Sequence, residues 1–207
     1  MKHSILTLSL LAASAGIAAP AAAQSAGDIT LGFGFHQVMP KSDNGSLGGG
    51  TLPVSVGKSA RPTFTAEYFI RDNLGIEVLA ALPFKHSVSI DGTGQVGTVK
   101  HLPPVISLQY HFQTGSAFSP FIGAGLNYTA FFSEKTSGAL AGSKLELKDS
   151  WGLALHAGFD YKVSDHGALR TDLRWMDIDT SVKLDGAKIG TVNIDPVVAG
   201  VSYVYRF

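Results

Sequence analysis

The chain has 207 residues, enough for one domain or two small ones, and its 16 basic and 16 acidic residues give a formal net charge of zero. This balance argues against nucleic acid as a partner, because phosphate binding needs clustered positive charge. The sequence contains no cysteine, so disulfide bonds are excluded as a source of stability.

The first 23 residues have the composition of a secretory signal. Lys2 and His3 give a basic start, an apolar run follows from Ile5 to Ile17, and the alanines at 21–23 provide a small-x-small cleavage site. The run is too short to cross about 30 Å of hydrocarbon as a helix. We predict a cleaved signal peptide over 1–23 and one domain over 24–207, without a transmembrane helix.

Apolar and polar residues alternate with period two through most of the predicted mature chain, which is the pattern of β-strands. Trp151, Leu153 and Leu155, for example, alternate with Gly152 and Ala154. In the third segment we expect one apolar face to run from Leu74 to Phe84. The alternating segments are residues 29–36, 64–71, 74–84, 102–112, 120–129, 150–163, 169–176 and 197–207.

The connections between these eight segments alternate in length. Short connections cover 72–73, 113–119 and 164–167, and long ones cover 39–60, 85–100, 132–148 and 179–193. Bacterial outer-membrane barrels have this layout, with short periplasmic turns and long external loops. We therefore expect an all-β, eight-stranded antiparallel transmembrane barrel in the outer membrane of a Gram-negative bacterium, with both termini periplasmic.

The distribution of charge distinguishes a membrane barrel from a soluble one. A soluble eight-stranded barrel such as a lipocalin turns its apolar face inward, whereas a membrane barrel turns it toward lipid. The strand centres carry no charge on their apolar face, and burying all the charges of the other face inside a small soluble barrel would be costly. The charges on the polar face are Glu67, Arg71, Glu77, Asp160, Lys162, Arg170, Asp172, Arg174 and Arg206. The membrane barrel is favoured, with outer-membrane lipid and lipopolysaccharide as its surroundings.

The last strand ends in an aromatic residue. Phe207 shares a face with Tyr205 and Tyr203. This ending resembles the signal that the outer-membrane assembly machinery reads, so we predict that machinery as a partner during biogenesis. The same residues also suit a lipid-facing strand.

Several motifs together resemble the outer-membrane protein W (OmpW) family, over nearly all of the mature chain. The resemblance implies a narrow eight-stranded barrel and passive passage of small apolar molecules. Leu79 fits the bulky apolar constriction of the family, whereas Arg174 departs from it. The matching stretches are Asp72–Gly75, Pro83–His86, Val99–Pro104, Pro120–Thr129, Lys148–Gly152, Met176–Thr180, and Asp195–Pro196 with Tyr205–Phe207.

For such passage we predict an entrance in the first long loop at Leu52, Val54 and Val56, and an apolar surface further inside at Leu79. Arg174 is tolerable in the lumen only if a carboxylate pairs with it. The other lumen candidates are Glu67, Glu77 and Asp172.

Pro103 and Pro104 begin the fourth strand and cannot donate ladder hydrogen bonds. We therefore predict a lateral opening at these two prolines.

Other chemistries are weakly supported. The Gly92–Gly97 segment matches G-x-G-x-x-G but precedes a strand, whereas a dinucleotide site needs a helix there. His36, His111 and His156 face inward, but without the spacing of zinc ligands. Ser107 and His111 share a face too far apart for nucleophilic catalysis. We expect no cofactor, no metal and no enzymatic activity.

Three alternatives remain open. In a barrel this narrow, side chains can fill the interior, which would make it a plugged structural barrel. The long loops suit a surface receptor or adhesin. A lipid-modifying outer-membrane enzyme is the remaining alternative.

Overall fold

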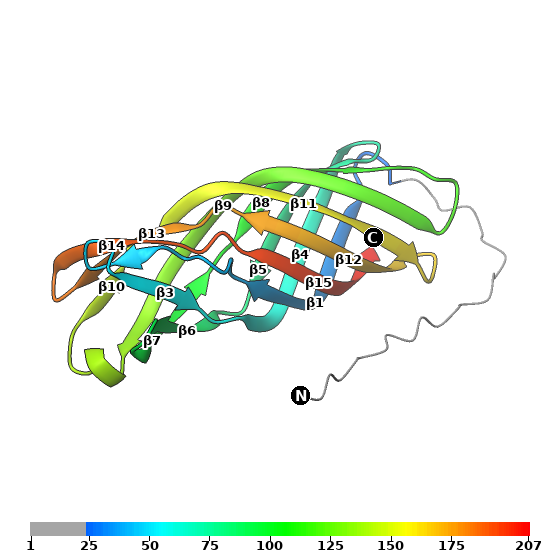
Figure 1. The fold of residues 1–207 in the computed structure, drawn as a ribbon. Coiled ribbons are helices and arrows are strands. Elements are labelled where there is room, and N and C mark those ends of the chain that lie inside the picture. Colours follow the sequence, from blue (N-terminus) through cyan, green and yellow to red (C-terminus); the bar gives the residue numbers. More distant parts are fainter. Residues whose placement is uncertain (1–23) are drawn as a thin grey trace, which may run out of the picture.

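The computed structural model describes residues 24–207, and the predicted signal peptide lies outside the described residues. Each of the eight long strands pairs with its neighbours in chain order, and β1 closes the barrel against β15 (Figure 1). The predicted eight-stranded antiparallel barrel is confirmed. Its strands are β1 (Ile29–Met39), β4 (Ser59–Arg71), β5 (Leu74–Ala81), β8 (Val105–His111), β9 (Phe118–Thr136), β11 (Ser150–Lys162), β12 (Gly167–Met176) and β15 (Val197–Arg206).

The long connections gather at one end of the barrel, here called the long-loop end, and continue its wall as short strands (Figure 1). The opposite end is called the short-turn end. Among residues 24–207, no helix is long and apolar enough to cross a membrane. The short elements are β2 (Ser46–Leu47), β3 (Leu52–Val56), β6 (Phe84–Ile90), β7 (Gly94–Leu102), η1 (Gly138–Leu140), β10 (Leu145–Leu147), β13 (Asp179–Leu184) and β14 (Ala187–Asn193).

Both ends of the described chain lie at the short-turn end. Asn73, in the turn between β4 and β5, donates its backbone N–H to the carbonyl of Gln24. Phe207 donates its backbone N–H to the carbonyl of Ile29 at the start of β1. The first strand therefore begins, and the last strand ends, at the short-turn end of the barrel.

The outer surface of the barrel is an apolar belt. Phe33, Leu108, Leu155 and Leu173 are about half exposed, and Trp151 is 73% exposed. A predominantly apolar surface of this kind is unfavourable in water and fits the hydrocarbon of a bilayer. Aromatic side chains mark both edges of the belt, namely Tyr110, Tyr161, Tyr203, Tyr205 and Phe207 at the short-turn end and Tyr128, Trp151 and Trp175 at the other.

Two side chains lie on the face opposite to the one predicted. Phe84 is 2% exposed and points inward, because an irregular segment at Leu82 and Pro83 separates β5 from β6 and shifts the alternation by one residue. Arg71 is exposed because the β4–β5 register slips between Phe69 and Arg71. A one-residue slip reverses every side chain that follows.

The belt makes a testable prediction for β11. Leu155→Arg places a cation near the middle of the lipid-facing surface and is expected to cost about 2–4 kcal/mol of folding free energy. Val163→Arg places the same cation at the short-turn edge and is expected to cost about 0–1 kcal/mol. Urea unfolding in lipid vesicles compares the two variants, and equal losses would contradict the outward assignment.

Candidate site in the barrel interior

Two buried arginines from β12 form the centre of an ion network inside the barrel. Arg170 Nε and Nη2 donate to Asp160 at 2.7 and 2.9 Å, and its Nη1 donates to Glu77 Oε2 at 2.9 Å. Arg174 Nη1 donates to Glu77 Oε1 at 2.7 Å and its Nε to Asp172 Oδ2 at 2.6 Å. Glu77 thus bridges the two guanidinium groups. All five side chains are largely hidden from solvent, so the network fills the cross-section of the lumen at this level.

A second set of polar side chains completes the network on the side of Glu67. His111 donates to Glu67 Oε1 at 3.0 Å, and Gln109 Nε2 donates to Glu67 Oε2 at 2.9 Å. Gln109 also contacts His156 through its Oε1 at 2.8 Å. Across the lumen, His36 donates to Asp172 at 3.1 Å. Each carboxylate therefore has several donors, as buried charge requires.

Glycines on neighbouring strands make room for the lumen histidines. A Cβ atom at Gly123 would lie 2.1 Å from His156 Nε2, and a Cβ at Gly200 would lie 2.1 Å from His36 Nε2. Real Cβ atoms cannot approach so closely, so these positions need glycine for the rings to lie against the wall.

An apolar layer covers the network on its long-loop side. The layer lies one inward position further along six of the eight strands, and its residues belong to one buried cluster. The residues of this layer are Val38, Leu79, Val105, Ala154, Met176 and Val198.

A cavity of about 150 Å³ lies beyond this layer, among the short strands of the long-loop end. Strands β2, β3, β6, β7 and β9 contribute apolar side chains to its walls. Examples, one from each strand in that order, are Leu47, Val56, Ile90, Val99 and Phe131. We call it the apolar cavity. Among residues 24–207, His86 and His101 are the polar side chains that line it.

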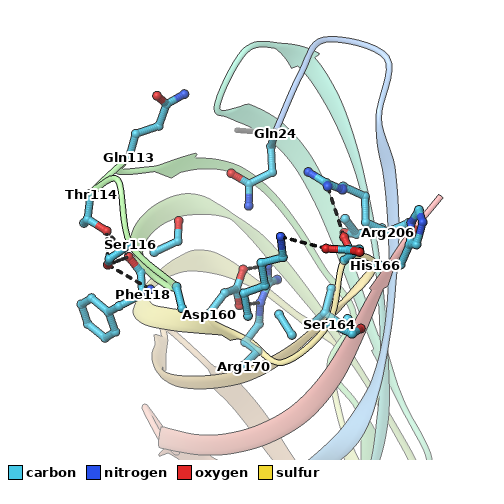
Figure 2. Close-up of a pocket in the computed structure, with 18 of the residues that line it drawn as sticks. Gln24, Gln113, Thr114, Ser116, Phe118, Asp160, Ser164, His166, Arg170 and Arg206 are labelled. Carbon is cyan, nitrogen blue, oxygen red and sulfur yellow. Dashed lines mark hydrogen bonds and ion pairs between the residues drawn. The ribbon is translucent and has the colours of Figure 1, made fainter. Parts of the chain in front are cut away.

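A second cavity, of about 130 Å³, opens at the short-turn end (Figure 2). Its lining is made mostly of polar residues and includes Gln24, Lys162 and Arg206, with Asp160 and Arg170 of the ion network at its inner end. The two cavities share no lining residue. The ion network and the apolar layer lie between them.

The barrel wall has a break beside the apolar cavity. Pairing of β5 with β8 ends at Leu79 opposite Val105, and pairing of β6 with β7 begins at Phe84 opposite His101. Between these points, residues 80–83 and 102–104 form no ladder with each other. Both segments instead pair on their other sides, as Leu102 does with Ala130 of β9. The predicted prolines lie within this break.

The structure brings together the predicted lumen residues Glu67, Glu77, Asp172 and Arg174. Arg174 has two carboxylate partners, so the condition set for its presence in the lumen is met. A role in transport stays a prediction for all of them. Asp160 and Arg170 were predicted to face inward but were not among the predicted site residues, because the alternation along a strand shows which face a side chain occupies and not which partners it meets.

The remaining predicted residues are distributed over the molecule. Leu52 and Val56 line the apolar cavity, whereas Val54 is buried in the core beside it. Tyr203, Tyr205 and Phe207 face outward at the short-turn end. Recognition of these three residues by the outer-membrane assembly machinery stays a prediction.

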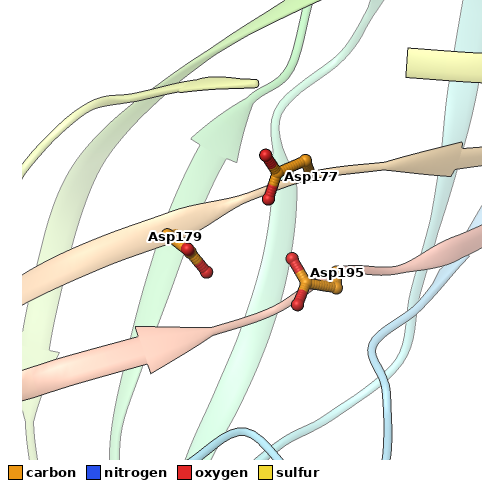
Figure 3. A group of neighbouring side chains, drawn as sticks. All are labelled: Asp177, Asp179 and Asp195. Atoms are coloured by element: carbon orange, nitrogen blue, oxygen red, sulfur yellow. The ribbon is translucent and has the colours of Figure 1, made fainter. Parts of the chain in front are cut away.

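Three carboxylates gather outside the lumen at the long-loop end, from Asp177, Asp179 and Asp195 (Figure 3). One oxygen of each lies within 4.8 Å of the others. Asp195 accepts from Lys41 Nζ at 2.8 Å, and Asp179 accepts from the amide of Asn193. These partners satisfy part of the cluster without a metal ion.

A closed eight-stranded barrel with an apolar belt outside and paired charges inside is a transmembrane β-barrel of the outer-membrane type. Residues 25–207 match the OmpW family, and the chain belongs to that family of bacterial outer-membrane proteins.

Relatives of known sequence and structure agree with this assignment. The chain is 38% identical to outer membrane protein W of Escherichia coli, over 98% of this chain and 99% of the relative. The crystal structure of OprG from Pseudomonas aeruginosa is similar with a TM-score of 0.78 and 34% identity, over 88% of this chain and 97% of that one. A more distant relative, the dibenzothiophene metabolism operon protein PahQ of Pseudomonas aeruginosa, is 26% identical over 70% of each chain.

Proposed function

We propose that the protein lets small hydrophobic molecules pass from outside the cell into the outer membrane. The long-loop end faces the exterior in this proposal, and both termini face the periplasm. The observation that carries it is the apolar cavity, because a site with walls of leucine, isoleucine, valine and phenylalanine suits apolar cargo. Outer-membrane lipid and lipopolysaccharide surround the belt.

The route cannot follow the barrel axis. Cargo moving straight from the apolar cavity would meet the apolar layer and then the side chains of Arg174 and Glu77, which are 2% and 0% exposed. Displacing a bridged pair of buried charges is costly, since each guanidinium would lose its partner. An apolar molecule therefore needs a side exit.

The wall break supplies a place for that exit. His101 lines the apolar cavity, and the buried ring of Phe84 packs against it with 5.7 Å between ring centroids. Phe84 is also the first residue of β6 after the break. Since Pro103 and Pro104 have no N–H to donate, the two edges of the wall are held less firmly there. Cargo would pass Phe84 and leave between the strands into lipid.

One relative supports an apolar cargo. PahQ carries the name of a dibenzothiophene metabolism operon protein, and dibenzothiophene is an apolar aromatic compound. The apolar walls of the cavity suit molecules of this general character.

The test measures uptake of a small apolar dye into proteoliposomes with lipopolysaccharide in the outer leaflet. Ile189 is half-buried in β14 and lines the apolar cavity. Ile189→Arg is expected to reduce uptake to the rate of protein-free vesicles, because it places a charge where apolar cargo must sit. Thr191→Arg, on the exposed surface of the same strand, is the control and is expected to keep the wild-type rate.

A second function is favoured by the ion network itself. If vesicles that contain the wild-type protein take up dye no faster than protein-free vesicles, the filled lumen supports a structural or receptor barrel that acts through its long loops.

A further inference from the structure

The two polar side chains of the apolar cavity contact each other. His86 of β6 and His101 of β7 are 2% and 1% exposed, and their Nε2 atoms lie 3.3 Å apart. Phe84 and Phe131 each pack against the His101 ring with 5.7 Å between centroids. A polar pair in such apolar surroundings raises the question of which nitrogens carry protons.

The contacts of His86 determine the protons of both rings. His86 Nδ1 contacts the carbonyl oxygen of Gly57, which can only accept, so Nδ1 carries the proton. A neutral imidazole has one N–H, so His86 Nε2 is an acceptor. The proton between the two Nε2 atoms must then belong to His101. This leaves His101 Nδ1 as a bare acceptor, and it is buried without a partner in the described structure.

Both rings are neutral at neutral pH, as this assignment requires. Burial, together with the neighbouring His86, lowers the pKa of His101 to about 3. Burial also lowers the pKa of His86, with Arg61 adding to the shift and the Gly57 carbonyl opposing it. The pair lies beyond the apolar belt, because Lys85 and Lys100 face outward at the same level, opposite each other.

We propose that the apolar cavity selects small apolar molecules that carry a hydroxyl group, such as aliphatic alcohols or phenols. The hydroxyl donates to His101 Nδ1, and the hydrocarbon lies against the leucine and valine walls. The His101 ring is one of the side chains that line this cavity. Alkanes and ethers cannot donate a hydrogen bond, so they leave the acceptor unsatisfied. This inference rests on the proposed passage of apolar molecules and adds a chemical class to it.

The first test observes the nitrogen directly. Wild-type protein with ¹⁵N-labelled histidine, in lipid nanodiscs, is titrated with heptan-1-ol and, separately, with its isomer methyl hexyl ether. The alcohol is expected to move the His101 Nδ1 resonance from the position of a bare nitrogen toward that of a hydrogen-bonded one, and the ether to leave it in place. Equal responses to both probes would overturn the assignment.

The second test compares affinities from the same titrations. Heptan-1-ol is expected to bind wild-type protein about tenfold more tightly than the ether, as one satisfied buried acceptor implies. The double variant His86→Phe/His101→Phe removes every histidine nitrogen of the cavity, and the ratio should fall to about one. His166→Phe, an exposed histidine at the short-turn end, is the control and should leave the ratio unchanged.

The outcomes separate this inference from the proposed passage. Equal wild-type affinities for the two isomers overturn the hydroxyl selection, while dye uptake independently supports or rejects passage. A retained tenfold preference together with dye uptake at the protein-free rate supports the binding site and rejects passage.

Discussion

Replacement of Glu77 by leucine is expected to lower the free energy of unfolding by about 3–5 kcal/mol, the usual cost of removing one partner from a buried ion pair. Glu77 is completely buried and accepts hydrogen bonds from both Arg170 and Arg174. Without Glu77, each of the two buried guanidinium groups loses one carboxylate partner. Leucine restores the volume of the side chain but none of the charge.

Urea unfolding in lipid vesicles measures this loss. Glu146→Leu is the matched control, because Glu146 pairs with Lys144 on the exposed surface of the long-loop end, where an ion pair contributes little. An unfolding midpoint for Glu77→Leu close to that of wild type would show that the ion network does not stabilise the barrel.

A disulfide across the wall break is expected to reduce dye uptake to the rate of protein-free vesicles. Leu82 and Leu102 lie on the two sides of the break, between the last β5–β8 pair, Leu79 with Val105, and the first β6–β7 pair, Phe84 with His101. Since the chain has no cysteine, Leu82→Cys/Leu102→Cys introduces one defined bond. Oxidation ties the two edges of the wall together and closes the side exit, and a reductant is expected to restore uptake.

A second disulfide in the intact wall provides the control. Thr171 of β12 and Val201 of β15 are paired and face outward, away from the break. Oxidised Thr171→Cys/Val201→Cys is expected to keep the wild-type rate. If the cross-link at 82 and 102 forms completely and uptake continues unchanged, the cargo does not leave through this part of the wall.

Much of the fold follows from alternation that is visible in the sequence. In β11, Trp151, Leu153 and Leu155 face outward as predicted, because a lipid-facing barrel reverses the usual placement of apolar residues. The prediction was wrong at Phe84, where Pro83 interrupts the strand. Apolar and polar residues continue to alternate in the sequence at this point, but the side chains no longer alternate between the two faces of the wall. That one-residue shift places Phe84 and His86 beside the apolar cavity.

The sequence by itself determined the barrel, its lipid-facing surface and the inward position of the charges, because each depends on a periodicity that local backbone geometry imposes. It also located the paired prolines of the wall break, since proline lacks an N–H wherever it occurs. Only the tertiary structure decided which charges meet, how Glu77 bridges two arginines more than 90 residues further along the chain, and which nitrogen of His101 lacks a partner. Such contacts join distant strands across the lumen, and their partners depend on the register and stagger of the closed sheet, which no local pattern records.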